Sequence, residues 1–372
     1  MVLKFTVLHC SKKSGARLGL IETSHGIIET PTFVPVGTNA ALKGVIDSSD
    51  IDLMFCNTYH LMLQPGTSVI KKMGGLHGFM KRNRPLITDS GGFQAFSLAY
   101  GSVAEEIKSC GKKRASSSVV KISEEGILFR SYRDGRQILL SPEISIASQK
   151  DLGADIIIPF DELPPYHIGE QELIQSCERT YRWELRSLDS HKKNIQGQSM
   201  YGIVHGGMNK VLRKEGCCFV SDHDFDGFAI GGSVGKNRQD VEEIVTFITS
   251  HLPSEKPRHL LGIGDPFSIQ NLIATGIDSF DSSYPTKAAR HGMIFSKEKG
   301  FIKIKQSKYS EDLSPIDSAC RCHTCKTVSL GYLHHLFKAY ELNGLSLASI
   351  HNLHYMNELM KIFRQKIVTD EL

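Results

Sequence analysis

The sequence predicts an α/β fold, a (β/α)8 barrel of the TIM type with an N-terminal antiparallel β segment and a C-terminal appendage. Eight short apolar runs, each about the length of a buried strand, end abruptly in a polar cluster. Helix-length segments separate most of these runs, which is the sequence outline of a barrel of parallel strands. The clusters begin at Val36, Asn57, Asp89, Asp161, His205, Gly231, Gly264 and Asp281.

The chain before the barrel reads as antiparallel β structure. Residues 3–30 contain two strand-like runs, Lys4–Leu8 and Ala16–Glu22, with glycines at Gly15 and Gly26. The first barrel strand is then expected at Thr32–Val36. Clear helical patterns follow later in the chain, at residues 142–152, 170–190, 237–251, 330–342 and 346–367.

An insertion follows the third barrel strand. It opens with a basic, Ser-rich stretch at residues 111–118, in which Lys112, Lys113 and Arg114 suit either a solvated loop or an RNA contact. Strand-like runs come next at residues 119–122, 127–132 and 137–140. Asp134-Gly135 between alternating runs favours a type I′ turn, so a β-hairpin is expected near residues 111–140 in place of a barrel helix.

Length and composition fit one barrel with an appendage. The chain has 372 residues, 40% of them hydrophobic, and a net charge of +4. We expect a catalytic barrel at residues 1–295 and the appendage at residues 296–372. No N-terminal signal or long apolar stretch is found, so a cytoplasmic protein without a membrane span is expected. Six of the nine cysteines are scattered, which also favours a reducing compartment.

The other three cysteines form the most specific local motif, Cys320-x-Cys322-x2-Cys325. Thiolates at this spacing bind zinc, and a structural zinc takes four protein ligands in a tetrahedron. His351, on the last predicted helix, is the expected fourth ligand. The alternative ligands are His323, His334, His335 and His354. One structural Zn²⁺ per chain is therefore predicted in a C-terminal zinc-binding subdomain.

Three of the strand-ending clusters carry an aspartate, Asp89, Asp161 and Asp281. The C-terminal ends of barrel strands form one face, so these side chains are expected to converge in an active site. A lone Asp at a strand end is usually a helix N-cap, but three on one rim favour catalysis. Asp281 suits a nucleophile at the anomeric carbon of a sugar, and Asp89 suits a proton shuttle to the leaving and entering base.

Glycine pairs beside these aspartates predict a flat ligand. Gly91-Gly92 and Gly231-Gly232 leave bare backbone whose polar groups can reach a heterocycle. Phe93 could stack on the face of such a ring.

A basic stretch follows the predicted nucleophile. Between Lys287 and Lys308 there are seven Lys or Arg residues and one acid, Glu298. In the run 301–305, alternation places Lys303 and Lys305 on one face of a strand. A lysine row of this kind is either a solvated strand edge or a contact for a phosphate backbone that passes over the barrel.

These motifs together closely resemble the tRNA-guanine transglycosylases, over about residues 3–367. The resemblance rests on residues 57–66, Thr88–Gln94, Pro159–Glu162, Tyr181-Arg182-Trp183, Gly202–Gly207, Gly231-Gly232 and the Cys/His zinc pattern.

The resemblance implies a base exchange: guanine at the wobble position of tRNAs with GUN anticodons is replaced by a 7-deazaguanine base, preQ1 or queuine. It implies that Asp281 is the nucleophile on ribose C1′ and that Asp89 is the general acid/base. It implies base-binding roles for Ser90, Gly91, Gly92, Phe93, Asp161, His205, Gly231, Gly232 and Ser233. It implies RNA contacts from Gly262, Ile263, Gly264, Asp265, Pro266, Phe267, Ser268, Thr286, Lys287, Ala288, Ala289 and Arg290. Zinc is implied at Cys320, Cys322, Cys325 and His351, and the implied assembly is a homodimer.

Four residues depart from the family pattern. Phe93 stands where Tyr is usual, His205 replaces a Gln that helps to bind the base, and Leu163 replaces a Cys of bacterial members. Lys236 stands where family members carry Glu. A cation here should disfavour the cationic preQ1 if its side chain points inward, so queuine becomes the alternative base. If Lys236 points to solvent, preQ1 remains the expected base.

Three rival functions stay open at this point. A non-catalytic, zinc-containing tRNA-binding partner subunit would share these motifs, although both Asp89 and Asp281 are present. An archaeosine-type enzyme would need a further C-terminal RNA-binding region. A barrel enzyme for a small phosphorylated metabolite would leave the cysteine motif and the lysine row unexplained.

Overall fold

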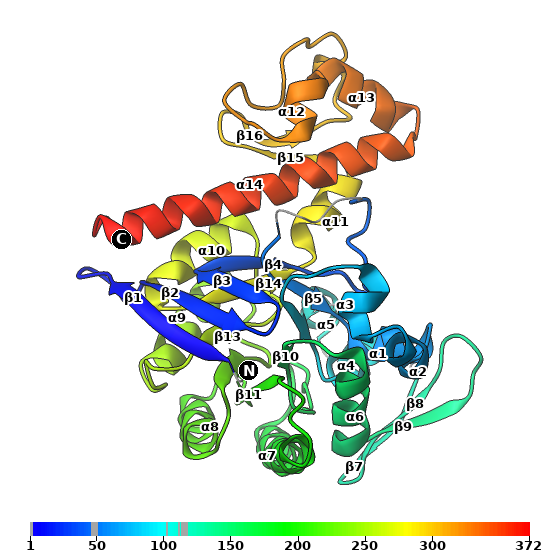
Figure 1. Ribbon diagram of the computed structural model, residues 1–372, viewed down its shortest axis with the longest axis vertical. Coiled ribbons are helices and arrows are strands. Elements are labelled where there is room, and N and C mark those ends of the chain that lie inside the picture. Colours follow the sequence, from blue (N-terminus) through cyan, green and yellow to red (C-terminus); the bar gives the residue numbers. More distant parts are fainter. Residues whose placement is uncertain (1–2, 46–50, 102, 111, 113–117) are drawn as a thin grey trace.

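The computed structural model describes residues 3–45, 51–101, 103–110, 112 and 118–372. Its centre is a barrel of eight parallel strands, as predicted (Figure 1). Their order around the barrel is β4, β14, β13, β12, β11, β10, β6, β5, and a parallel bridge between Val36 and Phe55 joins the last strand to the first. The strands are β4 (Thr32–Pro35), β5 (Met54–Cys56), β6 (Leu86–Thr88), β10 (Ile156–Ile157), β11 (Ser199–Val204), β12 (Gly227–Ile230), β13 (Arg258–Leu260) and β14 (Ser279–Ser282).

Alternating residues of these strands supply two apolar layers. Val34, Ile87 and Ile156 belong to a cluster that fills the barrel, whereas their neighbours Phe33 and Ile157 belong to the layer under the surrounding helices. Most of the strands are therefore apolar on both faces, because side chains alternate across a strand and a parallel sheet is covered on both sides. The eight apolar runs of the sequence reflect this double burial.

Eleven helices of the described chain surround the barrel or extend its loops. They are α1 (Thr58–Leu63), α2 (Thr67–Lys72), α3 (Gly75–Met80), α4 (Phe93–Tyr100), α5 (Val103–Lys108), α6 (Pro142–Leu152), α7 (Glu170–Lys192), α8 (Lys210–Asp222), α9 (Arg238–Thr249), α10 (Pro266–Leu272) and α11 (Tyr284–Arg290). The helix predicted at 142–152 has those bounds, because Ser141 caps its start and Gly153, at φ +68°, ends it.

The N-terminal β segment closes one end of the barrel. It consists of three antiparallel strands, β1 (Lys4–Cys10), β2 (Arg17–Thr23) and β3 (Gly26–Thr30). The first two were predicted, and the third was missed because it is short and follows β2 after a tight turn. Ile21 and Ile28 pack into the apolar cluster inside the barrel, so this segment covers the N-terminal ends of the barrel strands.

The insertion forms an antiparallel sheet of three strands, β7 (Val119–Ser123), β8 (Gly126–Arg130) and β9 (Gln137–Leu140). The predicted hairpin is confirmed, but the type I′ turn is wrong. The Ser131 N–H donates to the Arg136 carbonyl, which leaves a four-residue loop, and of its residues only Gly135 has a positive φ, +73°. Residues 111 and 113–117 of the basic stretch lie outside the described part of the chain.

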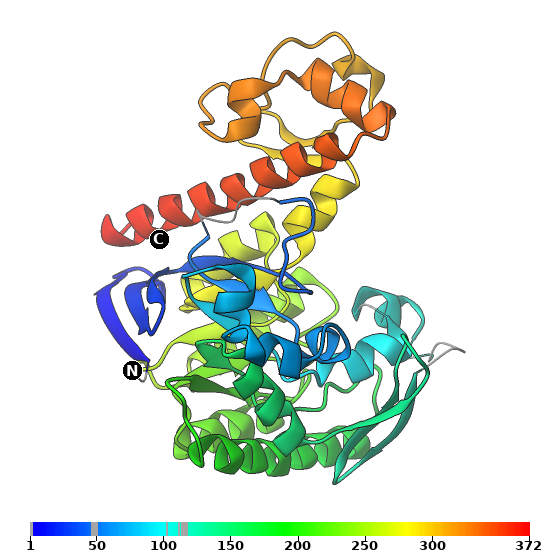
Figure 2. The ribbon, with the colours of Figure 1, turned by 45° about the vertical axis from the view of Figure 1, so that its right-hand side comes forward.

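The appendage begins with a β-hairpin and ends with a long helix (Figures 1 and 2). Its elements are β15 (Met293–Ser296), β16 (Gly300–Lys303), α12 (His323–Thr327), α13 (Leu330–Lys338) and α14 (Leu342–Val368). The helix predicted at 330–342 ends four residues early, and α14 begins at Leu342, four residues before the predicted 346. Tyr340, at φ +60°, lies in the break between them.

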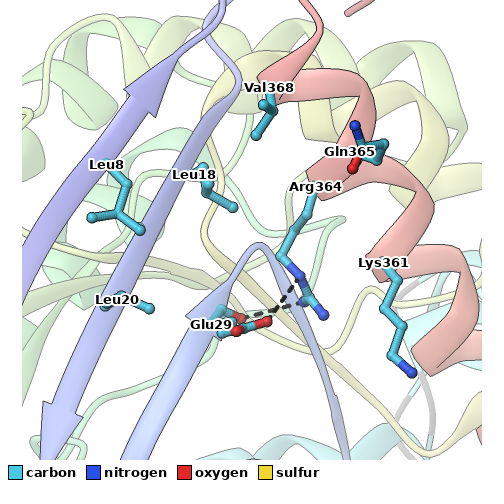
Figure 3. Close-up of a pocket in the computed structure, with 9 residues that line it drawn as sticks. Leu8, Leu18, Leu20, Glu29, Lys361, Arg364, Gln365 and Val368 are labelled. Carbon is cyan, nitrogen blue, oxygen red and sulfur yellow. Dashed lines mark hydrogen bonds and ion pairs between the residues drawn. The ribbon is translucent and has the colours of Figure 1, made fainter.

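Helix α14 joins the appendage to the barrel and to the N-terminal β segment. The Asn352 amide donates to the carbonyls of Pro285 and Met293 and accepts from the Phe295 N–H. At the other end of the helix, Arg364 pairs with Glu29 at 3.5 Å beside a shallow groove along β1 and β2 (Figure 3). No helix among the described residues is long and apolar enough to cross a membrane.

Candidate active site

The three predicted aspartates lie at the C-terminal ends of their strands. Asp89 directly follows β6, Asp281 is the third residue of β14, and Asp161 comes four residues after the end of β10. Their exposed fractions are 8%, 6% and 9%, respectively. Buried carboxylates need hydrogen-bond donors, and the donors that each one has indicate what it can do.

Asp89 is held by the residues that follow the neighbouring strand, β5. The Asn57 amide donates to Oδ2 at 2.7 Å, and the Thr58 N–H donates to Oδ1 at 2.6 Å. Burial raises the pKa of Asp89 to about 6, although hydrogen bonds from Asn57 and Thr58 act in the opposite direction. A carboxyl group with this pKa can both give and accept a proton near neutral pH.

Asp281 receives both of its hydrogen bonds on one oxygen. The Gly262 N–H donates to Oδ1 at 2.9 Å, and His259 Nε2 lies 3.1 Å from the same atom. Among the residues that the structure describes, no hydrogen bond reaches Oδ2. Asp281 therefore has one fixed oxygen and one free oxygen, an arrangement that suits a nucleophile.

Asp161 joins two of the other predicted base-binding residues. The Ser90 hydroxyl donates to Oδ1 at 2.8 Å, and His205 Nε2 lies 3.1 Å from Oδ2. Gly92 must be a glycine here, because a Cβ would come within 2.2 Å of the Asp161 carbonyl oxygen and 2.9 Å of Oδ1. The strand ends of β6, β10 and β11 thus meet in one polar group.

The predicted backbone edge at Gly231–Ser233 is held by Arg213, which sequence reasoning missed. Arg213 comes from α8 and is fully buried. Its guanidinium donates to the carbonyls of Val204, Gly207 and Gly231, each at 2.8 Å. Burial lowers the pKa of Arg213 to about 10. In the sequence it looks like a solvated helix residue, since Lys210 and Lys214 lie nearby.

The predicted stacking residue and the predicted RNA contacts lie in segments that follow β6, β13 and β14. Phe93 begins α4 and is 42% exposed. Residues 262–268 form the loop after β13 and the first turn of α10, and residues 286–290 lie in α11. Lys287 is exposed, while Ala288 and Ala289 are buried.

The predicted alternation in the run 301–305 is confirmed. Ile302 and Ile304 are buried, and Lys303 and Lys305 are exposed. The aliphatic side chains pack into the core of the appendage, so the two ammonium groups remain in water.

Lys236, the reversed charge of the sequence, is exposed. Its backbone N–H donates to Asp240 Oδ2 at 3.0 Å, so the loop is fixed through the main chain. An exposed ammonium group is screened by water and exerts a weak influence on its surroundings.

The cysteine motif and one histidine form a compact cluster in the appendage. The Sγ atoms of Cys320, Cys322 and Cys325 lie 3.9, 3.4 and 3.3 Å from His351 Nδ1. A tetrahedral zinc ion requires sulfur–nitrogen separations of about 3.6 Å, so the spacing fits. Of the competing histidines, none belongs to this group within the described chain.

The second nitrogen of His351 also fits a metal ligand. His351 Nε2 lies 2.6 Å from the Phe295 carbonyl oxygen, which fixes that nitrogen as the proton donor. Nδ1 then keeps its lone pair for a cation, in the arrangement common for metal-binding histidines. The four residues are therefore compatible with a metal site.

The barrel and the carboxylates of its C-terminal face define the class of this protein: an enzyme whose site suits transfer at a sugar carbon. A sequence model of the queuine tRNA-ribosyltransferase family matches residues 10–372. Proteins named queuine tRNA-ribosyltransferase from Chlamydia abortus and Chlamydia caviae are each 62% identical to this chain over 373 residues, with 100% of both chains covered. The protein of that name from Chlamydia trachomatis serovar D is 58% identical, with the same coverage. The chain therefore belongs to this family and is a pentosyltransferase.

Proposed function

We propose that this enzyme exchanges guanine at the wobble position of GUN-anticodon tRNAs for a 7-deazaguanine base through a covalent Asp281–ribose intermediate. The observation that carries the proposal is Asp281, with Oδ1 fixed by two donors and Oδ2 free of them among the described residues. A carboxylate held in this way can attack a carbon without first breaking a hydrogen bond on the attacking oxygen.

Asp89 would move the proton in both half-reactions. In the first, Asp281 Oδ2 bonds to C1′, the C1′–N9 bond breaks, and Asp89 gives its proton to the departing guanine. In the second, Asp89 accepts a proton from the incoming base, whose nitrogen bonds to C1′ as the C1′–Oδ2 bond breaks. A pKa of about 6 makes both protonation states of Asp89 accessible, which supports this assignment.

The base would be held by the group around Asp161. Ser90 and His205 orient the Asp161 carboxylate, and Arg213 fixes the loop whose N–H and C=O groups at Gly231–Ser233 would meet the edge of the base. Gly91 and Gly92 let the chain pack closely against Leu140 and Asp161, and the exposed ring of Phe93 would stack on the base. These roles follow the family resemblance, and the contacts between the residues support them.

The RNA would cross the C-terminal face of the barrel. Residues 262–268 and 286–290 follow β13 and β14, and the Gly262 N–H contacts Asp281 directly. The exposed Lys287, Lys303 and Lys305 would contact phosphates. We further propose a homodimer in the cytoplasm, and a division into a catalytic barrel and a zinc-binding appendage. The boundary expected at 295/296 falls inside β15, so the appendage is taken from Met293.

One structural zinc ion would be held by Cys320, Cys322, Cys325 and His351. It would crosslink the loop before α12 to α14 and leave no ligand position for substrate. The zinc would therefore support the fold of the appendage, and the barrel residues would carry out the exchange.

The incoming base is preQ1 or queuine. Because Lys236 is exposed, its charge is expected to change the preference by no more than a few-fold. The variant Lys236→Glu measures this effect directly. A rise of tenfold or more in kcat/KM for preQ1 alone would show that Lys236 excludes the cationic base.

The test is exchange of radiolabelled guanine out of a GUN-anticodon tRNA, chased in parallel with preQ1 and with queuine. The matched control is the same tRNA with another base at the wobble position. Loss of label with either base, from the GUN tRNA alone, supports the proposal. Retention of label with both bases would favour a non-catalytic tRNA-binding partner subunit.

A further inference from the structure

His259, one of the two groups that hold Asp281 Oδ1, has a second polar contact to which the proposed mechanism assigns no role. It lies on β13, next to β14, and its ring is fully buried. Nε2 is 3.1 Å from Asp281 Oδ1, and Nδ1 is 2.7 Å from the Ser279 hydroxyl oxygen. The ring also lies nearly parallel to Phe55, with an interplanar angle of 18°. Three residues thus form one hydrogen-bonded chain, from Ser279 through His259 to Asp281.

The carboxylate and the hydroxyl at the two ends of this hydrogen-bonded chain determine where its protons lie. An ionised carboxylate only accepts hydrogen bonds, so Nε2 must carry a proton toward Asp281. In a neutral ring Nδ1 is then an acceptor, and the Ser279 hydroxyl donates to it. Ser279 is itself buried on β14, two residues before Asp281, and its hydroxyl can donate to Nδ1 once the carboxylate has placed the ring proton on Nε2.

We propose that His259, with its tautomer set by Asp281 and supported by the Ser279 hydroxyl, is a positioning residue that fixes Asp281 Oδ1 and leaves Oδ2 as the attacking oxygen. The inference rests on the proposed function, because it concerns the same nucleophile. His259 and the Gly262 N–H occupy Oδ1 together, and the stacking on Phe55 keeps the ring in the plane that this bond requires.

The hydrogen bond from His259 to Asp281 also affects the two half-reactions differently. When Oδ2 bonds to C1′, Oδ1 becomes the carbonyl oxygen of an ester, which accepts a weaker hydrogen bond than a carboxylate does. The His259 N–H therefore stabilises the free carboxylate more than the covalent intermediate. It assists the second half-reaction, in which the C1′–Oδ2 bond breaks and its electron pair returns to Asp281.

If His259 only supported the fold, its loss would not affect the two half-reactions differently. Loss of His259 by general disorder would weaken tRNA binding and the covalent intermediate together. Loss of the donor should instead raise the ratio of covalent to non-covalent enzyme–tRNA complex while turnover falls. The expected rise in that ratio is about tenfold, from the difference between a charge-assisted and a neutral hydrogen bond.

The experiment compares His259→Phe, His259→Gln and Ser279→Ala in the full-length enzyme. Phe keeps the stacking ring without its donor, Gln keeps a donor N–H, and Ser279→Ala removes the supporting hydroxyl. For each variant we would measure kcat and KM for tRNA in guanine exchange, and the covalent fraction on denaturing gels at a fixed guanine concentration. His251→Phe is the matched control, since His251 is exposed at the end of α9.

We expect His259→Phe to lower kcat about tenfold with little change in KM and to raise the covalent ratio about tenfold. Gln should restore part of kcat, Ser279→Ala should act a few-fold in the same direction as Phe, and the control should match the wild type. Unchanged kcat in His259→Phe, or a covalent ratio that falls with kcat, would overturn the proposal. Wild-type enzyme without any exchange would instead overturn the proposed function.

Discussion

Both ends of the barrel bury carboxylates, but they surround them with different partners. At the C-terminal end, Asp89, Asp161 and Asp281 accept from amide, hydroxyl, imidazole and backbone donors. Among the described residues, no Lys or Arg forms an ion pair with any of the three. Each carboxylate at this end keeps some freedom to react or to bind, because no full positive charge neutralises it.

At the N-terminal end, the two buried carboxylates are paired with Arg or His side chains. Asp278 is fully buried, accepts from Arg17 Nε at 2.9 Å and from the Arg258 N–H at 2.7 Å, and forms an ion pair with Arg17. Asp155 accepts from the Leu86 N–H and lies within 3.3 Å of His25 and His77, whose rings stack on one another.

This difference separates the end of the barrel proposed to be catalytic from the end that stabilises the fold. Asp278 directly precedes β14 and Asp281 is its third residue, so the two carboxylates lie toward opposite ends of the barrel. A carboxylate tied to a guanidinium holds the fold together, whereas one held by neutral donors remains reactive. Four substitutions test this division.

The largest effect is expected for Asp281→Asn. An amide cannot form the ester with C1′, so guanine exchange should fall on the order of 10⁴-fold or more. The isosteric amide can still accept from the Gly262 N–H, so the thermal unfolding midpoint should change little. Exchange within tenfold of the wild type would remove Asp281 from the mechanism, whatever the stability of the variant.

Asp278→Asn makes the same chemical change directly before the start of the same strand. It leaves the buried Arg17 guanidinium without its counter-charge, which typically costs about 3–5 kcal/mol of stability. Urea unfolding measures this loss, and exchange assayed well below the unfolding transition should stay within about twofold of the wild type. A large loss of exchange in a folded Asp278→Asn protein would break the proposed division between the two ends.

The sequence predicted the carboxylates at the C-terminal end of the barrel but not the ion pair at its N-terminal end. Asp89, Asp161 and Asp281 were predictable because strand ends in a barrel converge, whatever lies between them in the sequence. The cysteine cluster was predictable because three of its four residues are close neighbours in the chain. Both features depend on local patterns or on a general property of the fold.

The residues that were missed depend on pairings between distant segments. Arg17 meets Asp278 across 261 positions, and Arg213 reaches three carbonyls from two different loops. A buried Arg in a helix and an Arg at the start of a strand look like solvated residues until the tertiary contacts are known. His259 was missed because it lies within a run read as an ordinary strand.

The third prediction uses the titration of Asp89. Its pKa is raised from the ordinary 3.8 to about 6 by burial, so the folded protein holds this proton more tightly than the unfolded chain does. The stability that results is present below the unfolded pKa and is lost as the pH rises from about 4 to about 6. A difference of about two between the pKa of Asp89 in the folded and the unfolded protein corresponds to about 3 kcal/mol of stability.

Removal of this titration should therefore stabilise the enzyme at neutral pH. We expect Asp89→Asn to unfold at higher urea concentration than the wild type at pH 8, with a difference that shrinks as the pH falls from 6 to 4. Asn57 can turn its amide to meet the new side chain, so the hydrogen bond survives. A difference that stays constant across this range would mean that Asp89 titrates normally.

The smallest effect is expected for Asp155→Asn, and its pH dependence has the opposite sign. Burial alone would raise the pKa of Asp155, but hydrogen bonds from His77, His25 and the Leu86 N–H outweigh it and lower the pKa. The stability from this carboxylate is then present above the ordinary pKa of Asp and is lost as the pH falls through the lowered value. We expect Asp155→Asn to cost about 2 kcal/mol at pH 7 and progressively less below pH 4, with exchange unchanged. Because Asp89 and Asp155 are both buried, burial alone predicts the same sign for both. Urea unfolding of the two variants over pH 3–8 therefore tests whether the hydrogen-bond donors around each carboxylate, and not burial alone, set the sign of its pKa shift.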